Sequence, residues 1–193
     1  AGASGNTKGR LPLFIDYPGL SLSDWGYDLE SYSVAYAFGA WLARNYGGAG
    51  LLGRLMKCSS TGPAPIEDVV SQETGHGESF DRILQRWSAA VLLSSETDAP
   101  YGYRYNTGGF FTSTVNGSAY RLGSVDLDNY TYGGPVGPRM YPGGTSGTWT
   151  VGTSEHLSTS IALYDATPVL QASGVLELTL DMPGGVIATV LVR

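Results

Sequence analysis

The sequence contains few of the residues on which most metal and cofactor sites depend. Among its 193 residues there is one cysteine, Cys58, and there are two histidines, His76 and His156, which lie far apart in the chain. A single thiol cannot form an internal disulfide, and these three side chains cannot fill the four positions of a zinc site. The motifs HExxH and CxxC are both absent. We therefore expect no metal ligands in this chain, and we expect Cys58 to pack as a small apolar residue on a helix.

Charged residues are also scarce, at 15% of the chain, and the formal net charge is −6. Because no basic patch could follow a phosphate backbone, nucleic-acid binding is disfavoured. The most apolar stretch, residues 31–46, is too short and too rich in Tyr and Gly for a membrane span. Hydrophobic residues still make up 42% of the chain, which is enough for a core. The 28 glycines and 13 tyrosines suit a secreted or cell-envelope protein.

The first half of the chain is predicted to be organised around a helix at residues 31–46. This stretch contains no proline and one charged side chain, Arg44, and its apolar or aromatic residues fall on every side of a helical projection. Such a pattern predicts a helix that is buried all round. Asp28 is placed to cap its N-terminus. Residues 11–29, which contain Pro12 and Pro18, are expected to form an ordered coil with at most one helical turn, at 21–25.

Three more helices are predicted after this one. The second covers residues 49–58, and the third begins at Pro65 and stops at Gly75. The fourth starts near Ser79 and carries an apolar stripe at i, i+3 and i+4 spacing. The residues of that stripe are Phe80, Ile83, Leu84, Trp87 and Val91.

Beyond residue 101 the helical period disappears, and Gly, Thr, Ser, Tyr and Val dominate. Asn116-Gly117 separates two segments, 110–115 and 119–122, which predicts a β-hairpin. Residues 133–153 are expected to form a long Gly- and Pro-rich loop. An antiparallel meander of three strands is predicted at 157–164, 174–180 and 186–192.

This change of period predicts an α+β protein. Residues 1–98 are expected to form a bundle of about four helices. Residues 99–193 are expected to form a mostly antiparallel β-sandwich domain. The boundary is placed where the helical pattern ends, near Ser95.

The order of motifs in the helical half is also informative. A Tyr-x-x-x-Tyr-x-x-Gly pattern begins the first helix, a Tyr-Gly-Gly break and a Leu-rich helix follow, and the last helix carries Phe and Trp. This succession resembles the C-terminal helical lobe of gluzincin-type zinc metallopeptidases, most of all the bacterial hyicolysin family. The resemblance covers residues 20–95. The matching positions are Tyr32, Tyr36, Gly39, Tyr46, Gly47, Gly48, Gly62, Ile66, Glu67, Gly75, Phe80 and Trp87.

The family's zinc-binding HExxH and downstream glutamate ligand are absent from this sequence. The resemblance therefore implies that they lie upstream in a precursor or on a partner chain, or that this is a relative without the chemistry. In gluzincin aminopeptidases a tyrosine in a Tyr-x-x-Gly context donates a hydrogen bond to the tetrahedral oxyanion. Tyr36-Ala-Phe-Gly39 matches that context, and Tyr32 is the alternative donor. The other interpretation is that Tyr36 is a core tyrosine with a satisfied hydroxyl.

The resemblance implies the C-terminal part of a secreted or cell-envelope zinc metallopeptidase that acts on a peptide or protein. This part would supply one wall of the active-site cleft and an accessory β domain. It would hold no cofactor and be inactive alone, since the zinc belongs to the missing catalytic portion. The alternatives are a structural cell-surface domain and a non-catalytic module that binds sugars or peptides through aromatic residues of the second half. Those aromatic residues, which could equally pack inside a sandwich, are Tyr101, Tyr103, Tyr105, Tyr130, Tyr132, Tyr141 and Trp149.

Overall fold

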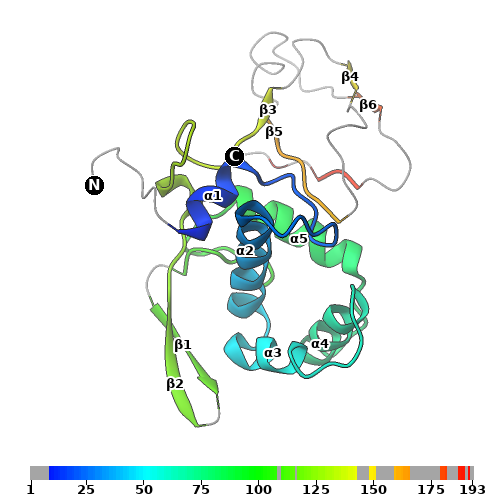
Figure 1. Ribbon diagram of the computed structural model, residues 1–193, viewed down its shortest axis with the longest axis vertical. Coiled ribbons are helices and arrows are strands. Elements are labelled where there is room, and N and C mark those ends of the chain that lie inside the picture. The colour runs from blue at the N-terminus through cyan, green and yellow to red at the C-terminus, as the bar shows by residue number, and fades with distance from the viewer. Residues whose placement is uncertain are drawn as a thin grey trace.

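The structure of the chain is a computed structural model, and it describes residues 9–107, 110–115, 117–142, 148–150, 159–165, 179–181, 187–189 and 191. The helices are α1 (Arg10–Asp16), α2 (Leu29–Asn45), α3 (Gly48–Leu55), α4 (Ala64–Thr74), α5 (Phe80–Leu92) and the 3₁₀ helix η1 (Leu127–Asn129) (Figure 1). The strands are β1 (Phe110–Val115), β2 (Ser118–Gly123), β3 (Tyr141–Pro142), β4 (Thr148–Thr150), β5 (Tyr164–Asp165) and β6 (Thr179–Asp181).

Helices α2 to α5 confirm the four helices predicted from the sequence. Local capping explains where they begin and end. The carboxylate of Asp28 accepts a hydrogen bond of 2.7 Å from the backbone N–H of Ser31, and the side chain of Ser79 caps α5 in the same manner. Helix α4 ends at Gly75, whose φ of 77° lies in the left-handed region that favours glycine.

Helix α1 was not predicted, because the expectation for residues 11–29 was coil. Pro12 is its third residue, where the missing N–H would have no partner within the helix in any case. Leu11, Phe14 and Ile15 are buried, and α1 packs against α2. The helical turn expected at residues 21–25 is absent, since the structure has only bends there.

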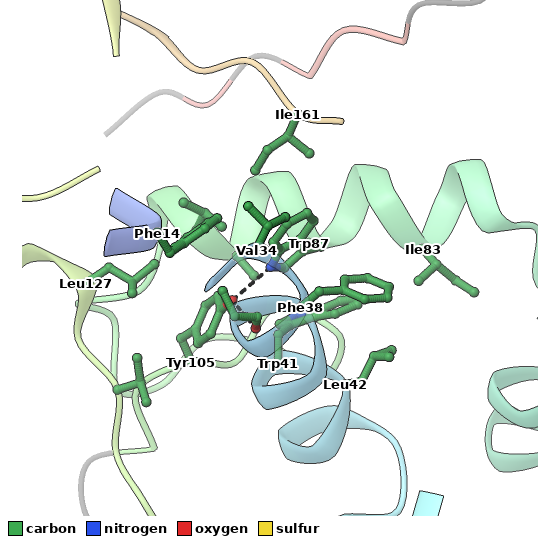
Figure 2. Packing of buried hydrophobic residues seen from close by; sticks show 14 of the residues in the cluster. Phe14, Val34, Phe38, Trp41, Leu42, Ile83, Trp87, Tyr105, Leu127 and Ile161 are labelled. Atoms are coloured by element: carbon green, nitrogen blue, oxygen red, sulfur yellow. Dashed lines mark hydrogen bonds between the residues drawn. The ribbon is translucent and has the colours of Figure 1, made fainter. Parts of the chain in front are cut away.

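The core lies where α1, α2 and α5 meet, and aromatic rings dominate it (Figure 2). Trp87 is fully buried, and its ring centroid lies 5.1 Å from that of Phe38 and 5.7 Å from that of Phe14. Its indole N–H donates a hydrogen bond of 2.8 Å to the hydroxyl of Tyr105. Trp87 therefore anchors α5 against α2, and the apolar stripe of α5 faces the core.

The prediction of a β-sandwich is wrong. Strands β1 and β2 do form the predicted antiparallel hairpin, which extends beside α3 as an arm (Figure 1). However, β3 pairs with β5 and β4 pairs with β6, both in parallel and over two or three residues. In the described part of the chain, strands occur only as these pairs, without two facing sheets.

The predicted meander is also wrong where the structure describes it. Within the three predicted segments, only Tyr164 and residues 179–180 are in strands, and those strands are parallel to their partners. Residues 187–189 and 191 are described without strand, and most of the other positions lie outside the described residues.

Apolar residues of the second half pack against the helices, whereas the predicted β-sandwich would have packed them between two sheets. Five of them belong to the same core cluster as the helices: Tyr105, Val125, Leu127, Ile161 and Leu163. They cover the helices instead of facing a second sheet. The division of the chain at residues 98 and 99 into two domains stays a prediction, although one core continues across it. Among the described residues, no helix combines the length and the apolar character that a membrane crossing requires.

Candidate functional site

Helix α2 is not buried all round, which corrects the prediction. Its core side carries Val34, Phe38 and Trp41, each at most 5% exposed. The opposite side is open, with Tyr32 46% exposed and Tyr36 54% exposed. Leu29, Tyr32 and Tyr36 follow each other at i, i+3 and i+7, and we call them the tyrosine face of α2. Aromatic residues on every side of a helical projection had suggested full burial, although tyrosine tolerates water on one side.

Tyr36 is therefore not a core residue. Its exposure contradicts the interpretation as a buried tyrosine with a satisfied hydroxyl. In the described part of the chain, that hydroxyl has no hydrogen-bond partner. Its role in catalysis stays a prediction.

Arg44 lies on α2 two turns after Tyr36 and interacts with it electrostatically. Burial lowers the pKa of Arg44, while the nearby tyrosines Tyr105, Tyr36 and Tyr130 act in the opposite direction. Burial likewise raises the pKa of Tyr130, with Tyr36 adding to this rise and Arg44 opposing it. The guanidinium is held by hydrogen bonds of 2.7 Å to the carbonyl of Ala40 and 2.5 Å to that of Gly123. The hydroxyl of Tyr36 thus lies within the field of a fixed cation.

Tyr32 has a more crowded environment than Tyr36. The ring of Trp25 meets it edge-on, with centroids 4.8 Å apart, and the guanidinium of Arg10 lies over it at 5.0 Å. The ring of Tyr27 also meets that of Trp25 edge-on, with centroids 6.5 Å apart. We call Trp25, Tyr27 and Tyr32 the aromatic cluster. It lies in the turn before α2 and in the first turn of that helix.

An open recess of about 390 Å³ lies at the C-terminal end of α2. Its walls include Arg44, Gly48 and the half-exposed ring of Tyr101. Residues 48–53, Gly-Ala-Gly-Leu-Leu-Gly, have the spacing GxGxxG. They follow a helix and lie within α3, so they lack the strand–turn–helix context that binds dinucleotides.

Asn45 is a structural residue that the sequence did not reveal. Its buried amide donates to the carbonyls of Trp41 and Arg104, at 2.8 and 3.0 Å. It also accepts from the backbone N–H groups of Gly102 and Arg104, at 3.0 and 3.1 Å. All four hydrogen bonds of this amide are made. They hold the segment that carries Tyr101 against the end of α2.

His76 belongs to a polar cluster around a buried carboxylate. The side chain of Glu78 is only 2% exposed and forms an ion pair with Arg86. The other carboxylate oxygen lies 3.2 Å from Nδ1 of the exposed His76. Arg86 also donates a hydrogen bond of 3.0 Å to the hydroxyl of Tyr46, and burial raises the pKa of Tyr46 to about 12. Through Arg86, the cluster ties the middle of α5 to the C-terminal end of α2.

The described residues do not fit a zinc ion. Among them, no three His, Cys, Asp or Glu side chains are arranged to hold a metal. His156 lies outside the described residues. Cys58 is exposed and follows the end of α3, so the expectation that it packs on a helix is wrong.

The aromatic residues considered for the binding module differ in how far they are buried. Tyr105 is fully buried in the helical core and cannot bind a ligand. Three others are exposed, and these are Tyr101, Tyr132 and Tyr141. Tyr103 and Tyr130 are half-buried, and the side chain of Trp149 lies outside the described residues.

The predicted site residues Tyr32 and Tyr36 thus lie together on one open face of α2, with Arg44 further along the same helix. Comparison with protein-family models, with curated proteins and with solved structures found no match.

Proposed function

We propose that this chain is the C-terminal part of a secreted or cell-envelope zinc metallopeptidase, and that the tyrosine face of α2 forms one wall of its active-site cleft. The observation that supports this function is the exposure of Tyr36 on a helix whose other side is fixed in the core. A side chain on a rigid, well-packed element can hold a donor in one position. The hydroxyl of Tyr36 is available to a group outside the described residues.

The zinc ion belongs to another portion, upstream in the same precursor or on a partner chain. The described residues offer no site for it, and we propose that this chain contributes shape and hydrogen bonding to the cleft. The substrate is a peptide or a protein.

Tyr36 would act on the oxygen of the scissile carbonyl, which becomes an oxyanion when the peptide bond is attacked. A phenol O–H is neutral at pH 7 and can donate a hydrogen bond to that oxygen. The nearby positive charge of Arg44 would favour negative charge developing beside the hydroxyl. Tyr32 is the less suitable donor, because its ring is already held between Trp25 and Arg10.

The test is the substitution Tyr36→Phe in the protein that includes the HExxH portion. We expect kcat to fall by about 10²–10³, as when one oxyanion donor is removed. KM, zinc content and melting temperature should change little, because the hydrogen bond forms only in the transition state. Tyr32→Phe is the matched control and should have a smaller effect. Full activity of the Tyr36→Phe enzyme would show that the tyrosine face has no chemical role in the cleft.

A second candidate function, a non-catalytic module that binds sugars or peptides, is favoured by the exposed rings of Tyr132 and Tyr141. Exposed aromatic rings can stack on sugar or peptide groups. The two functions are distinguished by the encoding gene. An HExxH motif in the reading frame upstream of Ala1, or in a gene whose product co-purifies with this chain, favours the peptidase.

A further inference from the structure

The aromatic cluster that precedes α2 has a geometry suited to binding a cation. The rings of Tyr27 and Tyr32 both stand nearly perpendicular to that of Trp25, at 87° and 82°. Rings at right angles present their electron-rich faces around a corner, as in the aromatic cages that recognise organic cations. Tyr27 is 85% exposed, so the ring faces on this side are accessible from water.

One ring of the cluster already binds a guanidinium from the chain itself. The central carbon of Arg10 lies 5.0 Å from the centroid of the Tyr32 ring, and Nη1 of Arg10 donates a hydrogen bond of 3.4 Å to the carbonyl of Leu29. This contact shows that a ring of the cluster can hold a guanidinium. In the described part of the chain, no cation lies over Tyr27.

The charge around the cluster is negative. Residues 24–30 contain the carboxylates of Asp24, Asp28 and Glu30 and no basic side chain. Asp24 and Asp28 are exposed, and none of the three carboxylates forms an ion pair with a described residue. A hydrogen bond from the backbone of Ser31 lowers the pKa of Asp28, so it stays ionised. These charges offset the positive end of the α2 dipole and attract cations.

The backbone of Tyr27 provides a separate indication. Its φ of 57° lies in the left-handed region, which is unfavourable for an aromatic residue and easy for glycine. Because the ring is almost fully exposed, burial in the core cannot explain the presence of tyrosine at this strained position. A strained, exposed residue is typical of a binding site.

We infer that the aromatic cluster binds an arginine side chain of a separate peptide. The guanidinium would lie in the corner between Trp25 and Tyr27, while the carboxylates of residues 24–30 attract it at longer range. This site consists of Arg10 and residues 24–32, does not include Tyr36, and does not depend on the proposed peptidase activity.

The experiment titrates the chain with a short glycine–serine peptide that carries two arginines and follows the backbone amide signals by NMR. The comparison peptide has citrulline in place of both arginines, which keeps the shape and removes the charge. We expect the arginine peptide to shift signals of residues 24–32 and to bind about fivefold or more tightly than the citrulline peptide. Added salt should weaken this binding, since the carboxylates are exposed.

Substitutions separate binding from folding. Tyr27→Gly should weaken binding of the arginine peptide by about two- to fivefold, the contribution of one exposed cation–π contact. Its melting temperature should not fall, because glycine suits the φ at this position. Tyr17→Ala removes another exposed tyrosine and should leave the affinity unchanged. Arg10→Gln should strengthen binding, because it removes a competing positive charge that lies 5.0 Å from the Tyr32 ring of the same cluster.

Each of four results would overturn the inference. The first three are equal affinities for the arginine and citrulline peptides, shifted signals confined to other parts of the chain, and unchanged affinity in the Tyr27→Gly variant. The fourth is failure of the arginine peptide to bind at millimolar concentration.

Discussion

The hydroxyl of Tyr105 donates a hydrogen bond of 2.6 Å to the carbonyl oxygen of Ala37, in the middle of α2. The same hydroxyl accepts a hydrogen bond from the indole N–H of Trp87 on α5. Since Tyr105 follows α5 in the chain, a residue beyond the helical bundle links α2 to α5 (Figure 2). All three residues are buried, so water cannot replace these hydrogen bonds without rearrangement.

Tyr105→Phe removes the linking hydroxyl and keeps the ring. We expect it to lower the free energy of unfolding by about 1–3 kcal/mol, because the buried N–H of Trp87 loses its partner. Urea denaturation followed by circular dichroism measures this loss. Tyr132→Phe, at an exposed tyrosine, is the control and should change stability little. Equal stability of the two variants would show that the Tyr105 hydroxyl is not required.

Trp87→Ala should be more damaging, because it leaves a cavity among Phe14, Phe38 and Tyr105 and also removes the hydrogen bond that the indole donates to the Tyr105 hydroxyl. We expect a loss of about 3–5 kcal/mol, the usual range for a buried tryptophan. Chemical denaturation tests this value. A loss below about 1 kcal/mol would contradict the role of the α5 stripe as a core face.

The buried hydroxyl of Tyr46 predicts a loss of stability at high pH. An unfolded tyrosine has a pKa of about 10, and burial raises the pKa of Tyr46 to about 12 in the folded chain. Between these values the unfolded chain releases a proton that the folded chain retains, which favours unfolding. The stability contributed by neutral Tyr46 is therefore complete below about pH 10 and is lost as the pH rises towards 12.

The measurement is the free energy of unfolding in urea at several values between pH 8 and 11.5. Tyr46→Phe should reduce the slope above pH 10, because it removes one of the protons involved. Other buried tyrosines, Tyr105 among them, keep contributing with the same sign. An identical slope in the variant would show that Tyr46 ionises normally in the folded chain.

The chain alone should not retain zinc after dialysis, because its two histidines and one thiol cannot complete a tetrahedral site. Metal analysis of the purified chain, with a known zinc peptidase dialysed in parallel, tests this. Stoichiometric zinc would point to His76 and His156 as ligands and would contradict the assignment of the metal to another portion.

Local interactions explain the parts of the fold that were predictable. The caps at Asp28 and Ser79 and the glycine at residue 75 act within one turn of their helices, so the sequence reveals them. The hairpin was predictable for the same reason, because a two-residue turn determines its register. Helix α1 was missed, because Pro12 counts against a helix unless it falls in the first turn.

The prediction of a β-sandwich was wrong for a general physical reason. Alternation in the second half indicates extended chain, but it does not say what the apolar side covers. Tyr105 and Ile161 cover the helices, and that depends on contacts between residues far apart in the sequence. The hydrogen bonds of the Asn45 amide could not be predicted from the sequence for the same reason, since its partners Gly102 and Arg104 are more than fifty residues away in the chain.

The tyrosine face of α2 also combines a feature that the sequence determines with one that depends on tertiary contacts. The sequence by itself determined that Tyr32 and Tyr36 share one side of a helix, because their separation of four residues is close to the helical repeat. Only the tertiary structure decided that this side is open, because α1 and α5 pack on α2 and bury Val34, Phe38 and Trp41 instead. A helical pattern that contains tyrosines on several sides does not predict which side is exposed to solvent, since a phenol ring is stable both in the core and in water.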